Sequence, residues 1–164
     1  MSNGFISQAE FTSACNVLPL VSIDFVVYAK TGRVLLGLRN NAPAQGFWFT
    51  PGGRIRKNEA HAEAMRRVAI SELGDPLLVV NAQLMGVWDH FYEDSAFSEQ
   101  VSTHYVNLPY FVRVEKEFEP PFEAQHMNWS WVKVAEAVED VAIHSYARAY
   151  LRWVLERVEG GING

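Results

Sequence analysis

The chain has 164 residues, of which 49% are hydrophobic and 20% charged, which is typical of one globular domain and excludes a fibrous or disordered chain. The formal net charge is −5 and no run of lysine and arginine occurs, which argues against a nucleic-acid partner or an anionic membrane surface. The single cysteine, Cys15, excludes an internal disulfide and a metal site built from several cysteines.

The chain shows no sign of a membrane or secretory segment. It has no apolar run close to the roughly 18 residues that cross a bilayer. The first residues, MSNGFISQAEF, lack the basic start and the apolar centre of a signal peptide. No internal repeat or Gly/Ser linker divides the sequence. We therefore expect a single domain over residues 1–164, located in the cytoplasm and without a membrane partner.

The first predicted elements are two strands and a long loop. Residues 21–29 and 34–38 are rich in aliphatic residues and flank a short turn, so they predict a hairpin. The loop that follows contains Pro51, Gly52 and Gly53, which force a sharp turn. Loops of this length inside compact domains usually carry function.

The next segment predicts a helix that contains an unusual carboxylate. Residues 59–73 show helical periodicity, with Asn58 as candidate N-cap and Gly74 just beyond the end. On a helical wheel, Glu72 falls in the middle of the apolar arc, in the last turn, where the helix dipole disfavours negative charge. An unpaired buried carboxylate costs several kcal/mol, so we expect either a cation beside Glu72 or a last turn that protrudes into water.

The second half of the chain predicts further strands. Residues 77–91 and 103–114 are rich in β-branched and aromatic residues, so we expect them to pair. The aromatic residues within 88–92 suit either a pocket wall or the core. Residues 115–128 hold two prolines and four glutamates, which predicts a solvated connection to a short strand at residues 129–132.

Two helices are predicted to close the chain. The second has an apolar stripe at three- and four-residue spacing, which we expect to pack on the sheet without a chemical role. The stripe consists of Ala147, Tyr150, Leu151, Val154 and Val158. Strands before and after a central helix, with more helix at the end, predict an α+β fold in which helices cover a mixed sheet.

The glycine turn before the central helix has the residue types of a phosphate or metal site. Gly52 and Gly53 expose backbone groups, and a carbonyl there can approach the same cation as Glu72. A hard divalent ion such as Mg²⁺ prefers such oxygens and bridges to substrate phosphates. Guanidinium groups, which suit phosphate binding, gather around this turn in an otherwise acidic chain. They belong to Arg39, Arg54, Arg56 and Arg67.

This segment resembles the Nudix box, whose pattern is G-x5-E-x7-R-E-U-x-E-E-x-G-U, where U is aliphatic. The matching positions are Gly53, Glu59, Arg67, Glu72 and Gly74. Three positions depart from the pattern, because Val68 and Ser71 replace glutamates and Asp75 replaces the last aliphatic residue. The chain therefore lacks acidic positions that supply ligands in family members with several metal ions.

With these departures, the segment resembles one branch of this family, the GDP-mannose mannosyl hydrolases. The resemblance covers about two thirds of the chain, through the segments PLVSIDFVV, LLGLRNNAPAQGFWFTPGGRI, SELG, GVWDHFYED, THYV and AQHMNWSW. It implies an α+β Nudix fold with a mixed sheet sandwiched between helices (α/β/α), a homodimer, and one Mg²⁺ or Mn²⁺ ion per subunit. The implied reaction is hydrolysis of GDP-mannose or a related GDP-hexose to GDP and free hexose.

The resemblance also implies roles for individual residues. The implied metal ligands are the carbonyl of Gly52, the carboxylate of Glu72 and the amide oxygen of Gln125. His126 takes the position of the general base, and Asp24 and Arg39 are the other implied catalytic residues. The residues implied to contact or orient the substrate are Arg54, Arg67, His90, Tyr105, Phe5 and Phe11, with the two phenylalanines enclosing the guanine.

These residue types suit displacement at the anomeric carbon. An imidazole titrates near neutral pH, so His126 can accept a proton from water that attacks opposite the diphosphate and inverts the sugar. Arg39 and Arg54, with a divalent ion, can neutralise the departing GDP, and Asp24 can orient the base or hold a sugar hydroxyl. Two other interpretations remain open: a Nudix pyrophosphatase that attacks phosphorus in a nucleotide or nucleotide sugar, and a nucleotide-binding domain without catalysis.

Overall fold

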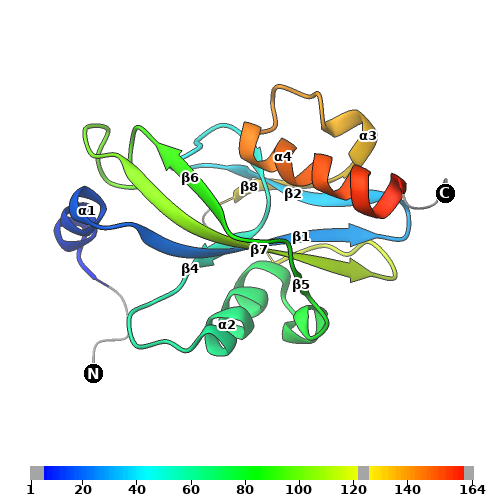
Figure 1. Ribbon diagram of the computed structural model, residues 1–164, viewed down its shortest axis with the longest axis horizontal. Coiled ribbons are helices and arrows are strands. Elements are labelled where there is room, and N and C mark those ends of the chain that lie inside the picture. Colours follow the sequence, from blue (N-terminus) through cyan, green and yellow to red (C-terminus); the bar gives the residue numbers. More distant parts are fainter. Residues whose placement is uncertain (1–5, 122–125, 161–164) are drawn as a thin grey trace.

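The computed structural model of the protein describes residues 6–121 and 126–160. Helices cover both faces of a central β-sheet (Figure 1), which confirms the predicted α+β fold with a mixed sheet sandwiched between helices. No helix in these two ranges is long and apolar enough to cross a bilayer.

The elements follow one another in a mixed order. The helices are α1 (Gln8–Val17), α2 (His61–Leu73), the short 3-10 helix η1 (Pro76–Val79), α3 (Val134–Ala137), α4 (Ser145–Val154) and the π-helical turn η2 (Leu155–Glu159). The strands are β1 (Leu20–Ala29), β2 (Arg33–Arg39), β3 (Trp48–Phe49), β4 (Gly52–Arg54), β5 (Gln83–Leu84), β6 (Trp88–Tyr92), β7 (Thr103–Val114) and β8 (His126–Lys133).

Strand β1 lies at the centre of the sheet, whose main path runs β3-β2-β1-β7-β5. It pairs in parallel with β7 along its whole length, from Leu20 opposite Tyr105 to Ala29 opposite Val114. The other pairings between described strands are antiparallel, including β4 on β1, β6 on β7 and β8 on β2. The short strand β4 thereby places Gly52 directly opposite Asp24.

Alternation along β1 divides the core into two layers. Phe25 and Val27 pack with the buried face of α2, whereas Val26 packs with the buried face of α4. Asp24 shares the parity of Val26, so its side chain belongs to the α4 face of the sheet. A carboxylate is thus built into a strand whose neighbouring residues are fully buried and apolar.

Helix α2 confirms the predicted end and corrects the predicted start. Gly74 ends it in the left-handed region at φ 81°, as a glycine permits. The N-cap is Ala60 and not Asn58, which itself adopts a left-handed turn at φ 63°. The helix starts later because the Glu63 carboxylate accepts the Ala60 N–H at 3.0 Å.

The prediction of one strand over residues 77–91 is wrong in its first part. Asp75 accepts the Leu77 N–H at 2.8 Å and Pro76 follows it, so the chain turns into η1 instead of extending. Gly86, at φ 114°, then separates β5 from β6. Pairing of this region with residues 103–114 is confirmed for the two short strands that remain.

Helix α1 was not predicted. Its start is a capping box, in which the Ser7 hydroxyl accepts the Glu10 N–H at 3.2 Å and the Glu10 carboxylate accepts the Ser7 N–H at 2.9 Å. Phe11 and Cys15 are its buried residues. The Ser-x-x-Glu spacing was the signal that could have identified this helix.

Candidate functional site

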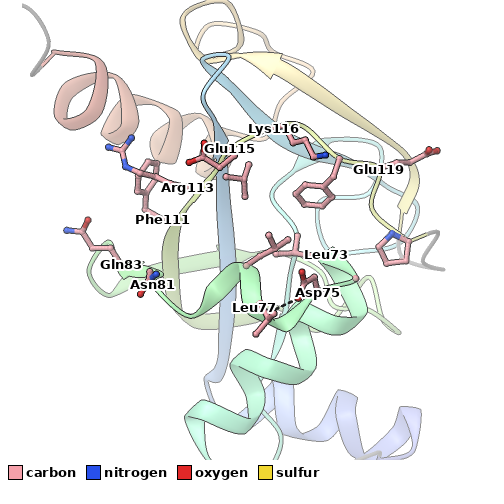
Figure 2. Close-up of a pocket in the computed structure, with 15 residues that line it drawn as sticks. Leu73, Asp75, Leu77, Asn81, Gln83, Phe111, Arg113, Glu115, Lys116 and Glu119 are labelled. Carbon is pink, nitrogen blue, oxygen red and sulfur yellow. Dashed lines mark hydrogen bonds between the residues drawn. The ribbon is translucent and has the colours of Figure 1, made fainter.

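A cleft of about 370 Å³ opens between α1, β1, β4, β6 and β7. The predicted site residues that line it are Phe11, Asp24, Arg39, Gly52, Arg54, His90 and Tyr105. A larger hollow of about 940 Å³ lies between the end of α2, η1 and β7 (Figure 2), and it holds none of the predicted site residues that the structure describes. The smaller cleft is therefore the candidate site.

Asp24 is a buried carboxylate held by neutral donors. Its Oδ2 accepts hydrogen bonds from Asn107 Nδ2 at 2.6 Å and Tyr150 Oη at 2.9 Å. Burial raises the pKa of Asp24 to about 6, and the hydrogen bonds from Asn107 and Tyr150 and the charge of Arg39 oppose this rise. The side chain is therefore largely ionised at neutral pH, as an anionic site residue must be.

His90 lies beside this carboxylate and is also buried. Its Nδ1 is 3.0 Å from Asn107 Nδ2, and its Nε2 is 3.2 Å from Tyr150 Oη. Burial lowers the pKa of His90 to about 4. The imidazole is thus neutral at neutral pH and is not a cation for the diphosphate.

Cationic and hydroxyl groups also line the cleft. Arg39 is anchored by its Nε, which donates to the Pro43 carbonyl at 2.9 Å. The guanidinium of Arg54 lies 5.4 Å from the centre of the Phe11 ring. Burial raises the pKa of Tyr105 to about 12, so its hydroxyl stays protonated and can donate a hydrogen bond.

Aromatic rings from two elements border the cleft. Phe11 of α1 meets Phe97, from the loop between β6 and β7, edge to face with ring centres 5.5 Å apart. Phe97 remains 51% exposed, so part of its ring is available to a ligand. Tyr92 of β6 also lines the cleft, whereas the adjacent Phe91 points to the other face and is 63% exposed.

A second hollow of about 170 Å³, here called the Gly-Gly cavity, adjoins the cleft on the α2 face. Its lining residues are Gly52, Gly53, Arg54, Arg56, Arg67, Val68, Ser71 and Glu72. Glu72 is 2% exposed, so the alternative in which the last helical turn protrudes into water is wrong. The other alternative, a cationic environment, is supported because three arginines line the same cavity.

The backbone of β4 joins the cavity to the cleft. Phe25 N–H donates to the Pro51 carbonyl and Ile55 N–H to the Val21 carbonyl, both at 2.8 Å. With the β1–β4 register, this alternation directs the carbonyl of Gly52 away from β1. A Cβ at position 52 would collide with the Asp24 carboxylate, and one at position 53 would lie 3.1 Å from Val68. The close approach of both layers therefore requires the two glycines.

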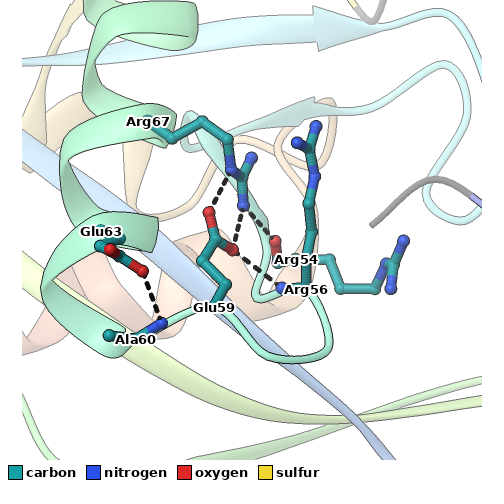
Figure 3. Close-up of polar contacts among 6 residues, drawn as sticks. All are labelled: Arg54, Arg56, Glu59, Ala60, Glu63 and Arg67. Atoms are coloured by element: carbon teal, nitrogen blue, oxygen red, sulfur yellow. Dashed lines mark hydrogen bonds and ion pairs between the residues drawn. The ribbon is translucent and has the colours of Figure 1, made fainter. Parts of the chain in front are cut away.

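Arg67 and Glu59 tie the loop to α2 (Figure 3). Arg67 Nε and Nη2 donate to the two Glu59 carboxylate oxygens at 2.6 and 2.9 Å, and Nη2 also donates to the Arg54 carbonyl at 2.8 Å. The hydrogen bond from Arg67 is the main cause that lowers the pKa of Glu59 to about 2. Arg67 thus orients the backbone that carries Arg54.

Three predicted residues fall at the limits of the described chain. Phe5 and Gln125 lie outside the described residues. The backbone of His126 begins β8 and pairs with that of Arg39, while its side chain lies outside the described part. Because Arg39 lines the cleft, this register brings the chain at position 126 to the edge of the candidate site.

Sequence reasoning missed several residues of the cleft. Asn107 and Phe97 line it, and Tyr150 reaches it through Asp24. An asparagine two positions after Tyr105, inside an otherwise apolar strand, was the available signal for Asn107. The helical stripe offered no such signal for Tyr150, because a tyrosine there is ordinary for packing.

Comparisons with known proteins concern the family and the fold of this chain. Residues 18–154 match the family model described as NUDIX domain. The Low-salt glycan biosynthesis protein Agl8 of Haloferax volcanii is 38% identical over 134 residues, covering 74% of this chain and 84% of that protein. The crystal structure of MutT NUDIX hydrolase from Burkholderia pseudomallei has a TM-score of 0.64 at 24% identity, covering 82% of this chain and 96% of that one.

A further solved structure shares the fold at lower sequence identity. The NUDIX domain of Shewanella oneidensis NrtR, complexed with ADP ribose, has a TM-score of 0.68 at 17% identity, covering 93% of this chain and 99% of that one. The segment matched by the family model includes the Gly-Gly cavity and the whole sheet, and it begins just after α1. The contribution of Phe11 to the cleft therefore lies outside the matched segment.

Proposed function

Because this chain belongs to the Nudix hydrolase family, we propose that it hydrolyses GDP-mannose or a related GDP-hexose to GDP and the free hexose, by attack of water at the anomeric carbon. The observation that carries the proposal is the junction at β4. There an arginine-lined cavity that contains Glu72 adjoins a cleft that contains Asp24.

The arginines account for a diphosphate ligand. Arg39 and Arg54 line the cleft, and Arg54 also lines the Gly-Gly cavity, in a chain whose net charge is −5. Guanidinium groups bind phosphate oxygens in bidentate fashion, and the Tyr105 hydroxyl can add a further donor. These groups stabilise negative charge as it develops on the departing GDP.

The residues of the Gly-Gly cavity fit a divalent cation. Its wall contains the Glu72 carboxylate and the Gly52 backbone, whose carbonyl points away from β1, and both are hard oxygen donors. Val68 and Ser71 occupy the positions where the Nudix pattern has further glutamates, which favours a single Mg²⁺ or Mn²⁺ ion held with Gln125. When bound, the ion neutralises charge on the diphosphate.

In this proposal, Asp24 binds the sugar and His126 activates the attacking water. The buried Asp24 carboxylate offers an acceptor for a hexose hydroxyl, next to the glycine turn. His126, on the strand that pairs with Arg39, takes the proton of the attacking water as the new C–O bond forms. The bond between the anomeric carbon and the diphosphate breaks, and its electron pair leaves with GDP, so the sugar configuration is inverted.

The aromatic border of the cleft suits a nucleobase. Phe11 and the half-exposed ring of Phe97 offer stacking surface, with Phe5 expected to add to it. Two relatives support a nucleotide-sugar substrate by what their names state. The Haloferax volcanii protein is named for glycan biosynthesis, and the NrtR domain was solved with ADP ribose, a sugar joined to a nucleoside through a diphosphate. The homodimer and the cytoplasmic location remain predictions.

The identity of the products tests the proposal. The protein is incubated with GDP-mannose and Mg²⁺ in ¹⁸O-water. Nucleotides and sugars are then separated by chromatography, and the ¹⁸O content of each product is measured by mass spectrometry. We expect unlabelled GDP and mannose that carries ¹⁸O at its anomeric carbon, with the inverted anomer as the first product seen by NMR. Label in GMP or mannose phosphate would show attack at phosphorus and establish the pyrophosphatase alternative, and tight binding without turnover would establish the non-catalytic one.

A further inference from the structure

Helix α4 contacts the candidate site through two tyrosines one turn apart. Tyr150 is fully buried, and its hydroxyl lies 2.9 Å from Asp24 Oδ2 and 3.2 Å from His90 Nε2. Tyr146 stacks on the His90 ring with centres 4.0 Å apart and planes 4° from parallel. Tyr146 is fixed in turn by Phe91, whose N–H donates to its hydroxyl at 2.8 Å. Helix α4 therefore contacts residues of the candidate site in addition to packing on the sheet, which the sequence analysis did not predict.

The hydrogen bonds around Asn107 assign donors and acceptors in this group. Asn107 Oδ1 accepts from the Ser22 hydroxyl at 3.0 Å, so Nδ2 faces Asp24, Tyr150 and His90, at 2.6, 2.8 and 3.0 Å. An amide nitrogen only donates, and its two protons serve these three neighbours, with the shorter contacts to Asp24 and Tyr150. The Tyr150 hydroxyl donates its own proton to Asp24 Oδ2. Burial raises the pKa of Tyr150 well above its ordinary value, so this phenol remains a donor.

These contacts fix one oxygen of the carboxylate. Oδ2 receives both the Asn107 and the Tyr150 hydrogen bonds, while Oδ1 lies against Gly52, where no side chain would fit. Asp24 and Gly52 both line the cleft, and Oδ1 is the oxygen that neither Asn107 nor Tyr150 holds. A buried charge surrounded by neutral donors costs stability relative to an apolar residue, so packing alone gives no reason for an acid here.

We propose that Tyr150 and Asn107 are positioning residues of the active site, which hold Oδ2 of Asp24 so that Oδ1 is presented to a hydroxyl of the hexose. The inference rests on the proposed function, because it assigns Asp24 to the sugar. Misplacement of a reacting or orienting group by about 1 Å can cost about a hundredfold in rate. Loss of one of two anchors is a smaller disturbance, and we expect it to cost about tenfold in kcat.

The test is a double-mutant cycle with a matched control. Tyr150→Phe keeps the ring and removes the hydroxyl, Asp24→Asn removes the charge, and Tyr28→Phe is the control because its hydroxyl bonds Glu159 at 3.2 Å, away from the cleft. With GDP-mannose we expect Y150F to lower kcat about tenfold and to change KM less than about twofold, and Y28F to leave both unchanged. In the D24N background we expect Y150F to have no further effect.

The outcomes separate this inference from the proposed function. If Y150F slows D24N as much as it slows the wild type, or leaves the wild type unchanged, Tyr150 does not act through Asp24 and the inference is overturned. If the products are GMP and mannose phosphate, the proposed function fails, and the same cycle on that reaction still measures the coupling. Without turnover, the cycle is measured on the Kd for GDP-mannose. If Y150F does not fold, Asn107→Ser takes its place in the cycle.

Discussion

On the α2 face of the sheet, Arg67 and Glu59 beside the glycine turn are charged and pair with each other, whereas on the α4 face the carboxylate of Asp24 takes its hydrogen bonds from neutral donors. Arg67 of α2 and Glu59 of the loop form a bidentate ion pair. Asp24 receives its hydrogen bonds from an amide and a phenol. The two faces meet at Gly52, which lines both the cleft and the Gly-Gly cavity.

The difference fits the two halves of a nucleotide sugar. A diphosphate carries charge and needs cations and guanidinium groups, which the α2 face and the loop supply. A hexose is neutral and is recognised by oriented acceptors and donors, which the α4 face supplies. The charge of Arg39 acts on Asp24, but the hydrogen bonds to Oδ2 come from the neutral groups of Asn107 and Tyr150, which leaves Oδ1 available to a sugar hydroxyl.

The largest effect on activity is expected from His126, which lies on β8 and on neither α2 nor α4. His126→Asn should lower kcat by roughly 10² to 10⁴ and largely spare substrate affinity, because a general base acts only in the transition state. Steady-state kinetics with GDP-mannose measure both, with His61→Asn, an exposed histidine on α2, as control. Unchanged turnover would remove His126 from this role and leave the buried, neutral His90 as the histidine to examine.

The charged face is tested through Glu72. Glu72→Gln keeps the size of the side chain and removes its charge, so we expect the Mg²⁺ concentration for half-maximal activity to rise by roughly 10- to 100-fold. Titration of activity with Mg²⁺, and direct Mn²⁺ binding by electron paramagnetic resonance, measure this change. Glu136→Gln on α3, an exposed carboxylate, is the control. Equal metal dependence in E72Q and wild type would show that Glu72 is not a ligand.

The ion pair of the loop is tested through stability. Glu59→Gln should lower the free energy of unfolding by about 2 kcal/mol at neutral pH, measured with urea, because charged hydrogen bonds to Arg67 are lost. The pKa of Glu59 is lowered from 4.5 to about 2 in the folded protein, so its stabilisation is complete above pH 4.5 and is lost as the pH falls toward 2. The difference between wild type and E59Q should shrink over that range. A constant difference would contradict the role of the ion pair.

The smallest effect is expected at the aromatic border. Phe97→Ala should weaken GDP binding by about threefold to tenfold, because one stacking surface is lost while the charged contacts remain. Calorimetry with GDP measures the Kd. Phe91→Ala, a more exposed ring on the opposite face of the same region, is the matched control. Equal Kd values for the two variants would place the nucleobase elsewhere.

Local patterns in the sequence predicted the parts of the site that are contiguous in the chain. Helical periodicity and the end at Gly74 placed Glu72 in the apolar arc of α2, in its last turn. The structure decided between the two alternatives left open for this side chain, because it is buried beside the glycine turn. The start of the helix was predicted incorrectly, because the choice between Asn58 and Ala60 depends on side-chain contacts within the loop. The roles of Gln125 and His126 came from resemblance and remain predictions.

The sequence by itself therefore determined the fold class, the glycine turn and the position of Glu72, because each depends on residues within a few turns of one another. Only the tertiary structure decided what surrounds Asp24. Asn107 lies 83 positions from it in sequence and Tyr150 lies 126 positions from it. Such contacts depend on the pairing of β1 with β7 and the packing of α4 over both, which no periodicity along the chain encodes.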